Sequence, residues 1–316
     1  MYLTMDGGGS KLAAAVYDKN FHVFARGRSG GVNLTQNTAE DALSHIRECL
    51  DAILDGVTEI EEAHVVFVGD RKMLETELRS RVEVQNLTFY GESEAGLLAG
   101  AGRRTGLLAL SGTGSDVFWR GENRSTCVGG WGPLLGDQGS GTWIGWEAIR
   151  AVSKSANGWG KETKLSELLY EHFGTPGKWI GMYNAVNGSK SPFTVISRTA
   201  PVVAQAAREG DEVALDILRR AGIAIGQQME AIFRRLPDIP DREITLCGGA
   251  WKTHPAMREA FEAYMKAIDP EFTVKSPWFE HVCAGPMSVA LDQGIPREKA
   301  RAILSETFSQ EVLSKD

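Results

Sequence analysis

Two glycine-rich segments within residues 107–141 hold the residue types that bind a phosphorylated or polyhydroxylated ligand. An apolar run from Leu107 ends in Ser111-Gly-Thr-Gly-Ser115, which predicts a strand leading into a tight turn with bare backbone N–H groups. The second segment, residues 129–141, sets one indole, Trp131, and one carboxylate, Asp137, among small residues. We interpret the pair as a phosphate-binding turn and the seat of a polyhydroxylated ligand. The alternative is an ordinary pair of turns with Trp131 in the core.

The start of the chain has the same order of features. An apolar run through Asp6 meets Gly7-Gly-Gly-Ser10, a second apolar run reaches Tyr17, and a third follows a polar turn. Two copies of strand, glycine turn, strand, turn and strand predict a duplicated fold with one phosphate-binding hairpin in each half.

Charged and amide side chains next to these turns are candidates for binding a metal ion, phosphate or sugar and for acting as a general base. Asp6 closes the first strand, where a carboxylate could hold hydrated Mg²⁺ beside phosphate or could cap the turn. Lys11 could contact phosphate or be solvated. Asn33, in a glycine loop, could bind sugar hydroxyls, although asparagine is common in loops. Glu92 and Glu94 lie at a predicted strand end or helix start, where either could serve as a general base or as ordinary helix-terminal charge.

Hydrophobic periodicity predicts alternating strands and helices, and therefore a mainly parallel sheet whose ligands gather at the carboxyl ends of the strands. Thr38 is the expected N-cap of the first helix and Gly56 its stop. Residues 174–197, which include Tyr183, are expected to be an irregular insert that closes one side of a pocket. The predicted helices cover residues 39–56, a segment through Leu74 and Leu78, 95–101, 142–152, 165–173, two stretches of 201–236, a segment from 254, 283–292 and a segment from 295. The predicted strands include 65–68, 84–89, 243–247 and 272–275.

Size and charge exclude several classes of protein. The 316 residues predict about two domains, and an apolar fraction of 42% with 24% charged residues is ordinary for globular proteins. A net charge of −7 argues against nucleic acid or an anionic membrane as a partner. We find no apolar run of about 18 residues and no secretory signal, so a cytoplasmic protein is expected.

Missing motifs narrow the chemistry further. The Walker phosphate loop, the dinucleotide-binding glycine fingerprint, the G-x-S-x-G elbow and H-E-x-x-H do not occur. The four cysteines (Cys49, Cys127, Cys247 and Cys283) are far apart in sequence, which predicts buried thiols rather than disulfides, zinc or an iron–sulfur cluster.

The ordered motif series resembles that of N-acetylglucosamine kinases. These belong to the wider family of benzoyl-CoA-reductase-type activating ATPases (BadF/BadG/BcrA/BcrD), within the superfamily of sugar kinases, actin and heat-shock chaperones. The resemblance covers nearly the whole chain and rests on Asp6 to Ser10, Ser111 to Ser115, Gly129 to Gly132, Gly136 to Ser140, and Cys247 to Lys252. It implies an α/β, two-lobed, actin-like (ribonuclease H-like) fold with duplicated halves and an ATP and sugar cleft between them.

The resemblance also implies roles for individual residues. The phosphate loops correspond to Gly7, Gly8, Gly9, Ser10 and Lys11 and to Gly112, Thr113 and Gly114, and the adenosine motif includes Gly248 and Gly249. Asp6 matches the carboxylate near Mg²⁺. The residues that match the sugar site are Asn33, Ser115, Gly130, Trp131, Asp137 and, more weakly, Tyr183. Glu92 best matches the catalytic base, where the family has an aspartate; the extra methylene moves the carboxylate by about an ångström.

By this resemblance the chain is expected to be an ATP- and Mg²⁺-dependent kinase that phosphorylates a hydroxyl, O6 by expectation, of N-acetylglucosamine, glucosamine or N-acetylmuramic acid. A homodimer is expected on the same basis. Residues 1–110 with a helix at about 295–316 would form the sugar and phosphate lobe, and residues 111–294 the nucleotide lobe. Two alternatives stay open: an ATPase that activates a partner enzyme, and a sugar sensor without catalysis.

Overall fold

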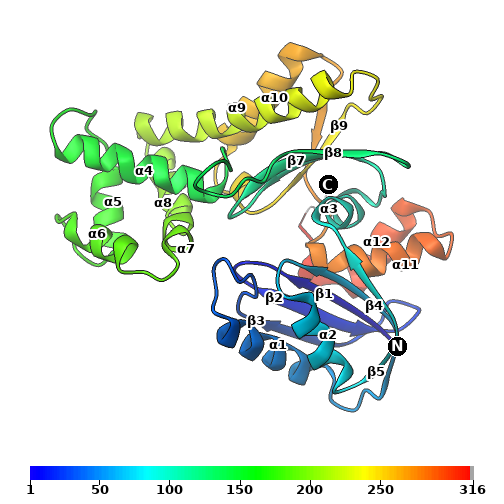
Figure 1. Cartoon of the computed structure of the whole chain (residues 1–316). Helices are drawn as coiled ribbons and strands as arrows, with labels where there is room; N and C mark the ends of the chain where they lie inside the picture. The colour runs from blue at the N-terminus through cyan, green and yellow to red at the C-terminus, as the bar shows by residue number, and fades with distance from the viewer. Residues whose placement is uncertain (314–316) are drawn as a thin grey trace. The chain divides into compact units, whose positions relative to one another are not determined.

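A five-stranded mixed sheet forms the centre of the first of two units in the computed structural model, which describes residues 1–313 (Figure 1). Its strand order is β3-β2-β1-β4-β5, with β1, β2 and β3 antiparallel and β1, β4 and β5 parallel. The strands are β1 (Tyr2–Gly7), β2 (Leu12–Tyr17), β3 (Val23–Ser29), β4 (Glu59–Phe67) and β5 (Glu83–Tyr90). The prediction of a mainly parallel sheet is wrong here, because the two hairpins of the first three strands are antiparallel.

Helices cover both faces of this sheet because alternate strand residues are apolar on both sides. Ala14 and Val16 belong to one core with α1 and α2, while Ala15 and Tyr17 belong to a second core with α3, α11 and α12. The helices of this unit are α1 (Ala39–Ile53), α2 (Arg71–Arg79), α3 (Glu92–Ala101), α11 (Ala284–Asp292) and α12 (Arg297–Thr307), with short 3₁₀ turns η2 (His281–Cys283) and η3 (Ser309–Glu311).

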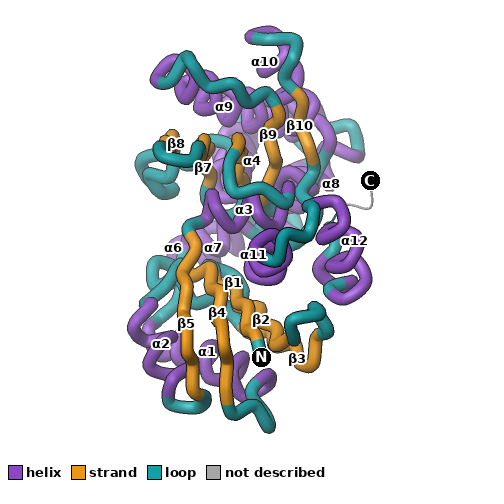
Figure 2. The backbone as a smooth tube through the Cα atoms, turned by 90° about the vertical axis from the view of Figure 1, so that its right-hand side faces the viewer, coloured by secondary structure: helices purple, strands orange, loops and turns teal. Residues whose placement is uncertain are grey.

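The second unit is built on a second five-stranded sheet with the order β10-β9-β6-β7-β8 (Figure 2). Strand β9 is parallel to both β6 and β10. The strands are β6 (Gly106–Ser111), β7 (Ser115–Arg120), β8 (Ser125–Gly129), β9 (Glu243–Cys247) and β10 (Thr273–Lys275). The helices are α4 (Gly141–Ala156), α5 (Leu165–His172), α6 (Ile180–Asn187), α7 (Pro192–Ser197), α8 (Ala200–Arg208), α9 (Glu212–Arg235) and α10 (Pro255–Ile268), with the 3₁₀ turn η1 (Ala250–Lys252).

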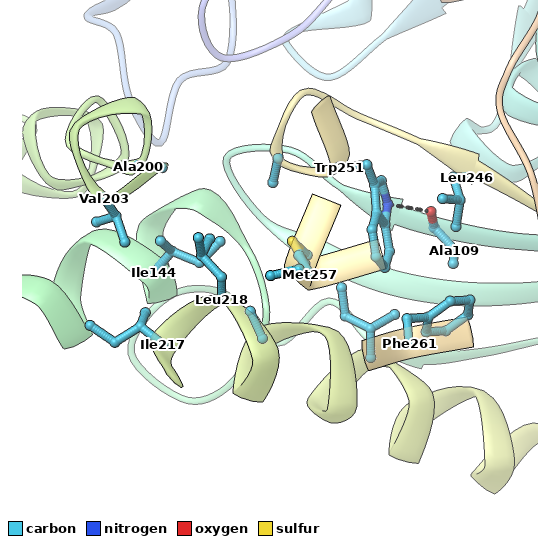
Figure 3. Close-up of a cluster of buried hydrophobic side chains, with 14 of the residues drawn as sticks. Ala109, Ile144, Ala200, Val203, Ile217, Leu218, Leu246, Trp251, Met257 and Phe261 are labelled. Atoms are coloured by element: carbon cyan, nitrogen blue, oxygen red, sulfur yellow. Dashed lines mark hydrogen bonds between the residues drawn. The ribbon is translucent and has the colours of Figure 1, made fainter. Parts of the chain in front are cut away.

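The core of this unit lies between its sheet and the helices α4, α8, α9 and α10. Figure 3 shows Trp251 of η1 beside Phe261 of α10, with the indole N–H donating a 3.0 Å hydrogen bond to the Ala109 carbonyl of β6. This bond satisfies the one polar atom of a 7%-exposed tryptophan and ties the segment after β9 to the central strand.

The two sheets have the same strand order, with β1 to β5 of the first corresponding in sequence order to β6 to β10 of the second. The predicted duplication is confirmed. The glycine turn between β1 and β2 therefore has its equivalent between β6 and β7, at the same place in each copy.

The division of the chain differs from the expected lobes at two boundaries and at residues 120–122, which belong to the first unit. The first unit contains Met1–Gly106, Arg120–Glu122 and the chain from Ser276 on; the second contains Leu107–Trp119 and Asn123–Lys275. Residues 276–294, expected in the second lobe, belong to the first because η2 and α11 pack on α3 and β1. Residues 107–110, expected in the first lobe, begin the second as part of β6.

The first helix follows its sequence signals. Thr38 caps α1 by accepting a 3.1 Å bond from the Asp41 N–H, as predicted, and the helix ends at Ile53, before Gly56. Residues 174–197, expected to be irregular, instead contain the helices α6 and α7. Each buries one apolar side chain, Met182 or Ile196, which is enough to hold a two-turn helix on the domain.

None of the helices in the described chain combines the length and apolar character that a membrane crossing requires.

Candidate functional site

The turn between β1 and β2 is closed by backbone contacts and leaves its main chain open at Gly8. The Gly8 N–H donates to the Lys11 carbonyl at 2.9 Å, and the Gly8 carbonyl accepts from the Val32 N–H at 2.8 Å. A Cβ built at Gly8 would meet no atom within 4 Å, whereas one at Gly9 would overlap the Gln36 side chain. The turn can therefore admit a phosphate group against its backbone at Gly8.

Two of the predicted phosphate and metal residues flank this turn. Asp6 lies near the end of β1, half-buried, in register with Ala13 of β2 and Val66 of β4. The Lys11 ammonium forms an ion pair with the Glu280 carboxylate just before η2. Glu280 lies 269 residues from Lys11 along the chain, and no sequence pattern pointed to it.

Asn33 lies next to the same turn, since its backbone N–H donates to the Gly8 carbonyl at 3.3 Å. Its Oδ1 accepts bonds from the Thr35 N–H at 3.0 Å and the Thr35 hydroxyl at 2.9 Å. The side-chain oxygen therefore holds a local turn, which is the ordinary role for asparagine in a loop. Its amide NH₂ group is the part that could donate to a ligand.

The second glycine turn, between β6 and β7, is fixed by the start of α4. Gly112 N–H donates to the Gly114 carbonyl at 2.9 Å, and Gly141 N–H donates to the Gly112 carbonyl at 2.8 Å. The Thr142 hydroxyl donates to the Thr113 carbonyl at 2.7 Å. A Cβ at Gly112 would meet nothing within 4 Å. An open main chain beside the positive end of a 16-residue helix favours an anion.

Asp137 is a buried carboxylate next to this turn. It is 5% exposed, its backbone has a φ of +57°, and its Oδ1 accepts a 3.1 Å bond from the Gly132 N–H. A Cβ at Gly114 would lie 2.8 Å from Asp137 Oδ2, so only glycine leaves room there. Burial raises the pKa of the Asp137 carboxyl, and the backbone N–H groups of Gly132 and Ser115 oppose that rise. A non-glycine residue at positive φ is strained, and such residues cluster at functional sites.

Trp131 projects into solvent with 74% of its surface exposed, so the alternative that Trp131 lies in the hydrophobic core is wrong. The Gly129–Gly132 loop that carries it is held by a 3.1 Å bond from Gly130 N–H to the Ser115 carbonyl. The Ser115 hydroxyl donates to the Gln138 carbonyl at 3.0 Å and is 2% exposed, so it supports the loop. The structure thus brings Gly112 to Ser115, Gly130, Trp131 and Asp137 into one cluster.

The two glycines after β9, Gly248 and Gly249, have different roles. Gly248 has a φ of +100°, and a Cβ there would overlap the Ser111 carbonyl and lie 2.8 Å from the Gly112 nitrogen. Its missing side chain lets β9 approach the phosphate turn. Gly249 has an ordinary φ of −74°, and a Cβ there would meet nothing within 4 Å. Gly249 is therefore the position with open space for a flat ring.

Glu92 and Glu94 differ in their surroundings. Both lie in the first turn of α3, after the N-cap Gly91. Glu94 pairs with Arg120 at 3.2 Å, which occupies its carboxylate, whereas Glu92 is exposed. The two carboxylates therefore differ in exposure. Arg120 was another residue that sequence patterns did not indicate, because the pair spans 26 residues between different elements.

Tyr183 does not join the cluster around Asp137. It lies on α6, where it packs against Trp179 and lines an apolar cavity of about 440 Å³ with residues of α4 and α5. No other predicted site residue lines that cavity.

The chemistry of the cysteines does not fit a metal cluster. The prediction of buried thiols is confirmed for Cys49, Cys247 and Cys283 and is wrong for Cys127, which is exposed on β8. Burial raises the pKa of the Cys49 and Cys247 thiols to about 12. Within residues 1–313, no group of three His, Cys, Asp or Glu side chains could hold a metal ion. Mg²⁺ needs no such cage, because one or two carboxylates together with substrate phosphates suffice.

A sequence model of the BadF/BadG/BcrA/BcrD ATPase family matches residues 3–277, most of the chain. The protein belongs to this family.

Two curated relatives are similar over most of their length. The chain is 26% identical over 287 residues to an N-acetylmuramic acid/N-acetylglucosamine kinase of Clostridium acetobutylicum, covering 86% of this chain and 92% of the relative. It is 26% identical over 255 residues to an N-acetyl-D-glucosamine kinase of Dictyostelium discoideum, covering 75% and 80% respectively.

Among solved structures, the proposed N-acetylglucosamine kinase of Porphyromonas gingivalis matches with a TM-score of 0.70 and 17% identity, covering 93% of this chain and all of that one. At this identity the likeness shows the fold alone. The fold is the two-lobed α/β fold of sugar kinases and actin-like ATPases, as the resemblance implied.

Proposed function

We propose that this family member is an ATP-dependent amino-sugar kinase, which phosphorylates a hydroxyl, O6, of N-acetylglucosamine or a related amino sugar. The observation that carries the proposal is the glycine turn with open main chain at equivalent positions of the two duplicated sheets, at Gly8 and Gly112. Each turn by itself suits a phosphate group, and the curated relatives are named as amino-sugar kinases.

The nucleotide would be held by residues whose backbone is accessible. The turns from Gly7 to Lys11 and from Gly112 to Gly114 would bind phosphates through backbone N–H groups other than those of Gly8 and Gly112, which donate within the turns, and Gly249 would lie against the adenosine. Asp6 would hold Mg²⁺ through water. The bound MgATP supplies the phosphoryl group and the metal charge that offsets charge on it during transfer. Lys11 would reach phosphate only by leaving Glu280.

The sugar would be read by the cluster around Asp137. The exposed Trp131 indole offers a flat apolar face to a pyranose ring. The Asp137 carboxylate can accept hydrogen bonds from sugar hydroxyls. Asn33 would contribute its amide NH₂ group. Gly130 would present main chain, while Ser115 would position the loop rather than contact sugar. We retain Tyr183 as a weaker sugar candidate.

Glu92 would act as the base. Its carboxylate would take the proton from the attacking sugar hydroxyl as that oxygen forms the bond to phosphorus, and ADP leaves with the electrons of the broken P–O bond. Its place in the first turn of α3 favours a carboxylate, and its side chain is exposed.

A coupled ADP-release assay tests the function against N-acetylglucosamine, glucosamine, N-acetylmuramic acid, N-acetylmannosamine and glucose. We expect turnover on an amino sugar, and we expect Glu92→Gln to lower kcat about 100-fold or more with the ATP KM little changed. Glu94→Gln is the matched control, since it removes the other first-turn carboxylate of α3 together with its pair with Arg120. Equal losses in both variants would refute the role of Glu92.

An absence of turnover on every sugar, with ATP still bound, would refute the kinase and leave a sensor or an activator of a partner enzyme. We further propose that the enzyme is a cytoplasmic homodimer, for which light scattering on the purified protein gives the mass in solution.

A further inference from the structure

One side chain of α9, that of the half-buried Gln228, contacts both ends of the loop of residues 130–138. Its Nε2 donates a 3.0 Å hydrogen bond to the Gln138 carbonyl at the end of this loop. Its Oε1 lies against Gly129, the last residue of β8 before the loop, where an added Cβ would overlap that oxygen. The start and the end of the loop therefore meet at a single amide group.

The Gln138 carbonyl fixes the orientation of this amide. A carbonyl can only accept, so the NH₂ group of Gln228 faces it and Oε1 faces Gly129. Oε1 is buried and has no hydrogen-bond partner among the described residues. The amide of Gln228 thus serves the loop as a donor, and its buried oxygen adds no bond that a substitution would break.

The loop has little apolar packing to hold it in place. Its large apolar side chains, Trp131, Leu134 and Leu135, are 74%, 77% and 76% exposed. A loop whose apolar side chains lie in solvent gains little from burial, so its position depends on hydrogen bonds to the rest of the unit.

The end of the loop is bonded to the sheet and to α9 at the same atom. The Ser115 hydroxyl of β7 donates to the Gln138 carbonyl at 3.0 Å, so this oxygen accepts one bond from β7 and one from Gln228. The next residue, Gly139, lies so close to α9 that a Cβ there would be 2.6 Å from the Ala221 carbonyl. Ala221 and Gln228 are seven residues apart, so they share the face of α9 that meets the loop.

Asp137 depends on these bonds because it comes directly before Gln138. Its φ of +57° is a strained conformation that persists only where neighbouring contacts hold it. The two bonds to the Gln138 carbonyl fix the chain just after Asp137, and the Gly132 N–H holds the Asp137 carboxylate. Helix α9 therefore supports the backbone of the residue that would bind the sugar.

We propose that Gln228 is a positioning residue for the sugar site, which holds the loop of Trp131 and Asp137 in place from α9. This inference rests on the proposed kinase function. The phosphate turn has bonds of its own to the start of α4, from Gly141 and Thr142. Loss of the Gln228 amide should therefore weaken sugar binding and leave ATP binding nearly unchanged.

The test compares Gln228→Met with Gln227→Met. Methionine has nearly the length and helix propensity of glutamine but no amide donor, and Gln227 is the exposed neighbour on the same helix. For Gln228→Met we expect the KM for N-acetylglucosamine to rise about fivefold, the effect of one net hydrogen bond, with kcat and the KM for ATP within about twofold. Gln227→Met is expected to keep all three wild-type constants.

A second variant separates the hydrogen bond from the shape of the side chain. Gln228→Glu keeps the shape, but at pH 8 its ionised carboxylate has no proton to donate to the Gln138 carbonyl. It should raise the KM for N-acetylglucosamine at least as much as Gln228→Met. A wild-type KM in Gln228→Glu would mean that the bond has no part in positioning the loop.

Two readouts do not depend on activity. Hydrogen exchange of the peptide covering residues 129–141 should be faster in Gln228→Met than in wild type and in Gln227→Met. The melting temperatures of both variants should stay within about 3 °C of wild type, because the Gln138 carbonyl keeps its bond from Ser115. Faster exchange without a lower melting temperature distinguishes a released loop from a destabilised unit.

Equal exchange in Gln228→Met and Gln227→Met would overturn the inference, as would an unchanged KM for N-acetylglucosamine in an active Gln228→Met enzyme. A wild type that phosphorylates no sugar would instead count against the proposed function. In that case the Kd of N-acetylglucosamine, measured by calorimetry, replaces the KM. Weaker binding by Gln228→Met than by wild type would then support the inference, and equal binding, or none by wild type, would overturn it.

Discussion

Gly248 and Gly249 are adjacent, yet adding one methyl group to each should have opposite effects. In Gly248→Ala the new Cβ enters a backbone with φ of +100° and overlaps the Ser111 carbonyl at the phosphate turn. In Gly249→Ala it enters open space with an ordinary φ of −74°. The pair therefore separates steric support of the fold from contact with the nucleotide.

The magnitudes follow from these two environments. A side chain at such a φ costs about 1–2 kcal/mol, and overlap with fixed main chain adds about 1–3 kcal/mol. For a unit of this size the sum lowers the melting temperature by about 10 °C. Gly249→Ala restricts the unfolded chain and should change the melting temperature by less than about 3 °C, with a rise favoured. Its methyl group should raise the KM for ATP about tenfold if adenosine lies there.

The assay is thermal unfolding monitored by tryptophan fluorescence. This signal reports mainly on the second unit, because seven of the eight tryptophans lie there and Trp278 alone lies in the first. ATP affinity is measured separately on the folded protein at 25 °C. If Gly248→Ala had the same melting temperature as wild type, the overlap of its Cβ with the Ser111 carbonyl would be refuted. A large fall in the melting temperature of Gly249→Ala would refute the conclusion that a Cβ at position 249 enters open space.

Two further predictions concern titratable groups. A thiol reagent at pH 8 should label about one cysteine per native chain and four after unfolding. The reason is that Cys127 is exposed, while burial raises the pKa of the other three thiols. Rapid labelling of the native Cys127→Ser variant would contradict this prediction. Burial lowers the pKa of His64, so its neutral form contributes stability that is complete above about pH 6.5, the unfolded pKa, and is lost as pH falls toward the folded pKa. Melting temperatures from pH 7.5 to 5 should therefore fall less steeply for His64→Gln than for wild type, and parallel curves would exclude His64 as a source of the slope.

Local features were readable from the sequence because near neighbours determine them. The glycine turns after β1 and β6, the Thr38 cap and the break between α8 and α9 depend on a few consecutive residues. The repeated order of strand and turn likewise predicted two sheets of one topology, which the structure contains.

Contacts between distant residues were decided only by the tertiary structure. Lys11 meets Glu280 across 269 residues and Glu94 meets Arg120, and no periodicity encodes either pair. These pairs changed the interpretation of the site, since Lys11, a predicted phosphate ligand, is paired with Glu280, and Glu94, a candidate base, is paired with Arg120.

Burial and backbone strain also depended on packing. The same glycine-rich segment could hold a buried or an exposed Trp131, and it holds Trp131 in solvent while burying Asp137 at positive φ. The helices α6 and α7 formed where composition suggested a loop, because one buried side chain in each outweighed weak local propensity. The sequence by itself thus determined the types of turn, the order of elements and the repeat. The folded chain determined which side chains are accessible, because accessibility follows from what packs beside a residue rather than from its neighbours in sequence.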